Sequence, residues 1–220
     1  MKNNKFFSVM TLTIALFSVA VVCKAQIPAA PFNVVEISHT IKDYAVWKKA
    51  FDADEFNRKV SGLNFIVIGR SNENPNNVTV VLHASDVAKA KTFSASPKLK
   101  EVMEKNGVVT KPEFSYYKVI RVNPDSKETS WVQVTYKVKD FDAWLKVFDA
   151  NGRTANRAAQ GLIDVVLARG IDDPNIVHLV FDIKDMAKAK AYMTSDETNK
   201  LRISAGMIGS PKIEFYNTAE

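Results

Sequence analysis

The chain contains the same unit twice. The segment from Val34 to Tyr117 reappears in diverged form from Ser130 to Tyr216, with a period of roughly 100 residues. Matched pairs include Trp47/Trp144, Gly62/Gly161, Arg70/Arg169, Pro75/Pro174, Asp86/Asp185, Gly107/Gly206 and Pro112/Pro211. This period is too long for a solenoid repeat and suits one small domain per copy. The sequence therefore predicts two units, over residues 31–121 and 130–217, joined by a polar linker at 122–129.

Each copy begins with a strand followed by a helix. Residues 34–40 and 131–137 alternate apolar and polar side chains, which indicates half-buried strands. Asp43 and Asp140 follow where a helix N-cap is expected, and Trp47 and Trp144 continue each copy at helical spacing. These aromatic stripes favour a packed core over a cofactor site.

The remainder of each copy predicts two strands, a second helix and a last strand. In the first copy, the strands are expected at 63–70 and 78–83, around a turn rich in Asn and Pro. Asp86 is expected to cap the second helix, Ser96-Pro97 to restart it and Gly107 to end it. The last strands are expected after Pro112 and Pro211. The order β-α-β-β-α-β, found twice, predicts the α+β class with two ferredoxin-like repeats.

A ferredoxin-like sheet has helices on one face and leaves the other face bare, so each copy is expected to cover the other. The pattern of Asp-capped helices, Asn/Asp-Pro-Asn turns and Pro-started last strands resembles the dimeric α+β barrel superfamily, in its antibiotic-biosynthesis-monooxygenase-like branch. Most members build the barrel from two chains. The resemblance therefore implies one intramolecular, pseudo-dimeric barrel, and a monomer.

The resemblance leaves the activity open, because the superfamily includes monooxygenases, isomerases, haem enzymes and ligand-binding domains. Haem-degrading relatives place a histidine and a tryptophan in or near the second helix. Residues 86–106 and 185–205 contain neither, which disfavours that activity here.

Strand parity separates a helix-side face from a barrel-side face. The parity places Glu36, His83, His178 and Glu214 on the barrel side, and His39 and Tyr136 under the helices. This polar barrel face has two interpretations: a self-satisfied network that fixes how the halves dock, or a polar wall for a ligand. We expect His39 to be a core histidine paired to one backbone group, whereas His178 could bind a ligand or move a proton.

Several classes of chemistry find little support. The three histidines lie on separate predicted strands without the spacing of a metal site, so we predict no metal and no cofactor. The sequence has no Gly-rich phosphate loop or nucleophile elbow. Its net charge of +6 is scattered rather than gathered on one face, which argues against nucleic acid as a partner.

Residues 1–25 have the pattern of a cleaved signal peptide: a basic start, an apolar stretch and a small residue, Ala25, at the end. Cleavage would lower the formal charge from +6 to +3, because the leader holds three lysines and no acidic residue. A retained anchor and lipid attachment at Cys23 are the alternatives. We expect a periplasmic or secreted protein with no stable membrane insertion after cleavage.

Two functions remain open. The first is a non-catalytic exported protein that binds a small, partly apolar or aromatic ligand. The second is a cofactor-independent monooxygenase or isomerase acting on an aromatic or quinol-like substrate. The candidate ligand-binding residues are His178, His83, His39, Tyr136, Glu36 and Glu214, and no residue is assigned as catalytic.

Overall fold

The computed structural model describes residues 27–127 and 129–219. The predicted leader, residues 1–25, lies outside the described residues. The elements follow the chain in this order: β1 (Phe32–Thr40), α1 (Tyr44–Ala53), α2 (Glu55–Val60), β2 (Leu63–Ser71), β3 (Asn77–Ala84), α3 (Val87–Ser94), α4 (Pro97–Lys105), β4 (Glu113–Val122), β5 (Ser130–Val138), α5 (Phe141–Phe148), α6 (Arg153–Ala159), β6 (Leu162–Gly170), β7 (Ile176–Ile183), α7 (Met186–Thr194), α8 (Asp196–Ser204) and β8 (Met207–Ala219).

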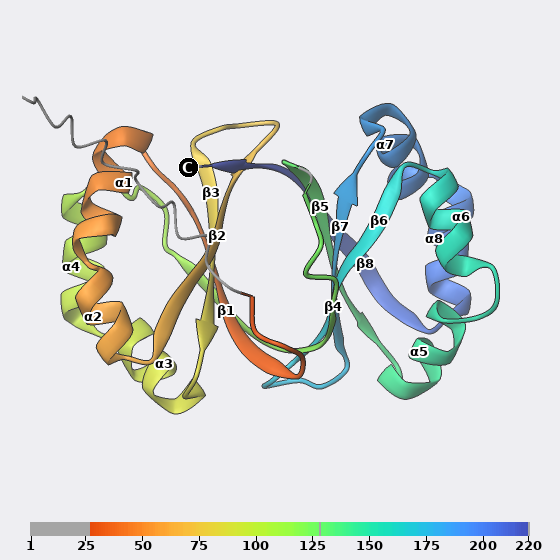
Figure 1. Ribbon diagram of the computed structural model, residues 1–220, viewed down its shortest axis with the longest axis horizontal. Helices are drawn as coiled ribbons and strands as arrows, with labels where there is room; N and C mark the ends of the chain where they lie inside the picture. Colours follow the sequence, from red (N-terminus) through yellow and green to blue (C-terminus); the bar gives the residue numbers. More distant parts are fainter. Residues whose placement is uncertain (1–26, 128, 220) are drawn as a thin grey trace, which may run out of the picture.

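All the strand pairs are antiparallel, and the strand order is β1-β3-β2-β8-β5-β7-β6-β4. This order closes on itself, because β1 pairs with both β3 and β4. The first half contributes β4-β1-β3-β2, and it joins the second half through the pairs β2·β8 and β4·β6. Helices α1–α4 lie outside the sheet on one side and α5–α8 on the opposite side (Figure 1). The predicted α+β class, with eight antiparallel strands, is confirmed.

Four aspartates start helices as predicted. Asp43, Asp86, Asp140 and Asp185 each accept a hydrogen bond from the backbone amide three residues further on. Such a bond satisfies one of the amides that a first helical turn leaves free. The predicted restart at Pro97 is also confirmed, since Pro97 is at the first position of α4.

Three boundaries differ from the prediction. The first predicted helix of each copy is divided in two, at Asp54 and before Gly152, whose φ of +79° is incompatible with a continuous helix. The last strand of the second copy begins at Met207, before Pro211. A register shift opposite Thr135 to Lys137 lets Pro211, which has no amide proton, lie within β8.

Apolar side chains form two clusters under the helices, one in each half, as the strand parity predicts. A third cluster lies inside the barrel and is built from Phe32, Val34, Tyr117, Val119 and Ala168. The barrel interior is therefore apolar around this cluster and polar around Glu36, Gln133 and Glu214. No helix in the ranges 27–127 and 129–219 is long and apolar enough to cross a membrane.

Candidate functional site: a polar pocket at one end of the barrel

A cavity of about 320 Å³ borders the polar part of the barrel interior. Both halves line it, through residues of β1, β4, β5, β7 and β8, the last residue of β6 and the turn between β6 and β7. We call it the barrel-end pocket. Its lining residues are Glu36, Ser38, Glu113, Phe114, Ser115, Tyr116, Tyr117, Gln133, Thr135, Gly170, Asp172, Asp173, Ile176 and Lys212.

The inner wall of the barrel-end pocket is a hydrogen-bonded group that crosses between the halves. The Gln133 amide nitrogen donates to Glu36 Oε1 at 3.1 Å and to Glu214 Oε2 at 2.9 Å. Gln133 is 2% exposed, and its amide oxygen has no hydrogen-bond partner among the described residues. An acceptor buried in this way costs free energy unless something donates to it.

His178 lies directly behind this wall. Its Nδ1 is 2.9 Å from the Thr135 hydroxyl, and its Nε2 is 3.6 Å from Glu36 Oε2. The Tyr117 ring stacks on the imidazole with centroids 4.2 Å apart. Burial, helped by the positive charge of Lys212, lowers the pKa of His178 to about 3. The imidazole is therefore neutral at physiological pH, with one ring nitrogen as donor and the other as acceptor.

Glu36 is the titratable group of this wall near neutral pH. Burial raises its pKa to about 7, the charge of Glu214 adds to the rise, and the hydrogen bond from Gln133 opposes it. At neutral pH the carboxyl group is thus divided between its protonated and ionised forms. Burial likewise raises the pKa of Tyr117, so its hydroxyl keeps its proton.

Charged side chains surround the mouth of the barrel-end pocket. The Lys212 ammonium is 3.2 Å from Glu214 Oε2 and 3.5 Å from Glu113 Oε2. Burial lowers the pKa of Lys212, but the carboxylates of Glu214 and Glu113 outweigh burial and the net shift is upward. At the rim, Asp172 pairs with Lys91 and Asp173 pairs with Lys137.

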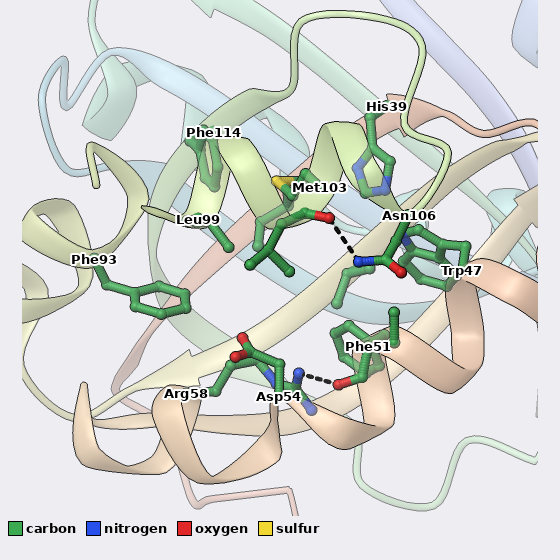
Figure 2. A pocket seen from close by; sticks show the side chains of 14 residues that line it. His39, Trp47, Phe51, Asp54, Arg58, Phe93, Leu99, Met103, Asn106 and Phe114 are labelled. Carbon is green, nitrogen blue, oxygen red and sulfur yellow. Dashed lines mark hydrogen bonds between the residues drawn. The ribbon is translucent and has the colours of Figure 1, made fainter. Parts of the chain in front are cut away.

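A smaller cavity of about 60 Å³ lies between the sheet and the helices of the first half. Figure 2 shows His39 beside Asn106 and Trp47 at its edge, with Phe51 and Arg58 on the helices opposite. The expected backbone partner of His39 is absent: neither ring nitrogen has a hydrogen-bond partner among the described residues. Burial lowers the pKa of His39 to about 4, so it too is neutral.

The equivalent cavity of the second half has a volume of about 70 Å³. Here Tyr136 occupies the position of His39, and Trp144 Nε1 donates to the Tyr136 hydroxyl at 3.0 Å. Burial raises the pKa of Tyr136 to about 12. The position that is unpaired in the first half is therefore paired in the second.

Of the six candidate residues, the structure brings Glu36, Glu214 and His178 together at the barrel-end pocket. His39 and Tyr136 lie in the separate helix-side cavities. His83 does not line this pocket and packs edge-on against Phe32, with the ring centroids 5.8 Å apart.

Several members of the site were not among those candidates, including Gln133, Tyr117, Glu113 and Lys212. The repeat contained a signal for two of them, since Gln133 is at the position of Glu36 and Lys212 at the position of Glu113. Both pairs differ in charge between the copies. Within the described residues, no group of three or more His, Cys, Asp or Glu side chains could hold a metal ion.

The chain is similar to known proteins at the level of the fold. No protein-family model matches the sequence, and no curated protein matches it. Solved structures do match. A candidate chlorite dismutase, 17% identical, superposes with a TM-score of 0.56 over 86% of this chain and 95% of that one. A candidate monooxygenase from Lactobacillus acidophilus NCFM, 14% identical, gives 0.53 over 85% and 94%.

A heme-binding protein from Thermus thermophilus, 11% identical, gives a TM-score of 0.53 over 86% of this chain and 92% of that chain. The chain has the dimeric α+β barrel fold. At these identities the likeness concerns the fold, because unrelated functions share it.

Proposed function

We propose that this protein binds a small, partly apolar molecule in the barrel-end pocket, without catalysing a reaction. The observation that carries the proposal is the size and lining of that pocket. At about 320 Å³ it is within the range of small-molecule sites, whereas the helix-side cavities of about 60 and 70 Å³ are far smaller. Polar groups and the Tyr117 ring line the same space, which suits a ligand with both polar and apolar parts.

The proposal includes an intramolecular pseudo-dimer. The two ferredoxin-like repeats, residues 31–121 and 130–217 with the linker 122–129, would take the places of two subunits. The hydrogen bond from Gln133 to Glu36 and the ion pair of Lys212 with Glu113 each join one half to the other. The barrel-end pocket would thus need both repeats but no second chain.

The proposal also includes export. Residues 1–25 would be removed as a signal peptide, which leaves a periplasmic or secreted protein that begins at Gln26. N-terminal sequencing of protein recovered from the periplasm or medium tests this. A mature chain that starts at a lipid-modified Cys23, or one that keeps Met1, would contradict it.

Binding in the barrel-end pocket can be tested with paired blocking variants. Ser115→Leu narrows the barrel-end pocket, while Ala50→Leu narrows the first helix-side cavity, since each residue lines one of them. Small aromatic fragments observed by NMR should lose binding in the first variant and keep it in the second. Thermal melts of both variants confirm that each is folded. The opposite pattern would contradict the proposal.

A second candidate function is cofactor-independent oxidation or isomerisation of a quinol-like substrate. It is favoured by His39, whose unpaired nitrogens could accept a substrate proton in the cavity of Figure 2. The name of the Lactobacillus acidophilus protein points the same way. Oxygen uptake with reduced quinols tests it: consumption by the wild type that is lost in His39→Ala would support this candidate over the first.

A further inference from the structure

The barrel-end pocket has a marked imbalance of charge. Four carboxyl groups line it, from Glu36, Glu113, Asp172 and Asp173, against the ammonium group of Lys212. Lys212 is already shared between Glu113 and Glu214. Lysines outside the lining neutralise the two aspartates at the rim, so the excess negative charge is concentrated on Glu36, Glu113 and Glu214.

The unpaired atom of the inner wall, the Gln133 amide oxygen, also favours a hydrogen-bond donor. The buried Gln133 oxygen is an acceptor without a donor among the described residues, and Gln133 lines the pocket. Its amide nitrogen is already used twice, by Glu36 and Glu214. A ligand group that enters here therefore meets carboxylate and amide oxygens, all of which accept hydrogen bonds. A group with several N–H donors and a positive charge satisfies them together.

The surroundings favour an organic cation over a metal ion. No group of three or more metal-ligating side chains is formed by the described residues. On the barrel side, Ile176 and the buried Tyr117 ring supply apolar and aromatic surface next to the carboxyl groups. Aromatic faces attract cations as well as apolar groups. Both parts of an amphiphilic amine thus find a complementary surface.

We infer that the ligand of the barrel-end pocket is a small primary amine with an apolar body, whose ammonium group is held between Glu36, Glu113 and the Gln133 amide oxygen. This inference rests on the proposed function and specifies its ligand class. The apolar body lies against Tyr117 and Ile176.

Binding of such a cation is coupled to ionisation of Glu36. The groups that face Glu36 come from every neighbouring element: Glu113 and Tyr117 from β4, Gln133 from β5, His178 from β7, and Lys212, Glu214 and Tyr216 from β8. Glu36 itself has a pKa of about 7, whereas the neighbouring His178 stays neutral down to far lower pH. Amine affinity therefore increases as the pH rises through 7, by up to about tenfold.

The test is isothermal titration of the intact chain with three probes of one shape: 2-phenylethylamine, 2-phenylethanol and phenylacetate. At pH about 8 we expect the amine to bind about tenfold more tightly than the alcohol, with the carboxylate weakest. Glu36→Gln should remove most of the preference for the amine. Glu104→Gln, which removes an exposed carboxylate on α4, should leave it intact.

A second variant keeps the test decisive if Glu36→Gln does not fold. Glu113→Gln changes an exposed side chain at the mouth and should weaken amine binding about threefold without affecting the fold. If 2-phenylethanol or phenylacetate binds in this pocket as tightly as the amine, the inference is wrong and the proposed function stands. If none of the three binds at millimolar concentration, both are overturned.

Discussion

The two halves of the molecule have the same order of elements but differ at positions that matter chemically. Under the helices, the first half has His39, whose ring nitrogens have no partner among the described residues, and the second has Tyr136 bonded to Trp144. Inside the barrel, Glu36 of the first half meets Gln133 of the second. The shared positions build the frame, and the positions that differ create the polar chemistry.

Inside the barrel, equivalent positions of the two halves are in contact with each other. Glu36 and Gln133 are aligned in the repeat, and so are Glu113 and Lys212, and each pair is in contact across the join. Two identical halves would place Glu36 against a second glutamate and Glu113 against another, at a high electrostatic cost. The differences between the two halves avoid both contacts and make the pocket asymmetric.

The largest expected effect concerns the tryptophans under the helices. Trp144→Ala should lower the free energy of unfolding by about 3–5 kcal/mol, because it removes a large core side chain and the partner of Tyr136. Trp47→Ala should fall at the low end of this range, because His39, which stands at the position of Tyr136, makes no hydrogen bond among the described residues that this change could break. Urea unfolding of both variants measures the difference. A larger loss for Trp47→Ala would contradict the comparison.

The next prediction concerns the free energy of unfolding, which depends on pH through the Glu36 carboxyl group but not through the neutral amide of Gln133. Glu36 has a pKa of about 7 when folded and 4.5 otherwise, so the folded chain binds more protons between these values. Its contribution to stability is complete below pH about 4.5 and is lost as the pH rises through 7. Glu36→Gln removes this loss. Relative to the wild type, the variant should gain on the order of 2–3 kcal/mol between pH about 5 and about 8.

Urea unfolding across this pH range provides the measurement. The pKa values of His178 and His39 are lowered, so their contributions are lost as the pH falls, and the variant leaves both histidines in place. A constant difference between variant and wild type at all pH values would show that Glu36 titrates normally.

A smaller effect tests the paired and unpaired positions under the helices. Tyr136→Phe leaves Trp144 Nε1 without its acceptor and should cost about 1–2 kcal/mol of unfolding free energy. His39→Leu removes two buried nitrogens that lack partners among the described residues and should be neutral or stabilising by up to about 1 kcal/mol. Thermal melts at one pH compare the two. Destabilisation by His39→Leu as large as that by Tyr136→Phe would mean that His39 has a partner.

The smallest effect is at the mouth of the barrel-end pocket. Lys212→Gln removes the ammonium group that competes with a bound amine for Glu113. We expect the affinity for 2-phenylethylamine to rise about twofold to threefold, because the pair is partly exposed. Titration calorimetry measures it, with Lys98→Gln on α4 as the control. Weaker binding in Lys212→Gln would indicate that Lys212 contacts the ligand itself.

Much of the frame could be predicted from the sequence, because it depends on local patterns. Asp43 and Asp140 begin helices through a hydrogen bond three residues away, and strand parity places Val35 and Val132 under them. The breaks at Asp54 and Gly152 were not predicted, although Asn151-Gly152 is a dipeptide typical of turns and gave a signal for the second one.

The site was predictable only in part. Parity places Glu36 and His178 on the barrel face, but it does not tell which part of the barrel interior apolar side chains fill. That depends on the cluster of Phe32, Val34 and Val119, formed by strands that are distant in sequence. The unpaired state of His39 depends on packing in the same way. The contact between Glu36 and Gln133 required knowledge of how the halves dock.

Intermolecular NMR contacts of 2-phenylethylamine with the protein test the central claim most directly, namely that the ligand lies inside the barrel between the halves. The account predicts contacts from the probe to the Tyr117 ring, the Ile176 methyl groups and the Gln133 side-chain amide. Contacts to Phe51 and Met103, which line the helix-side cavity of Figure 2, would contradict it.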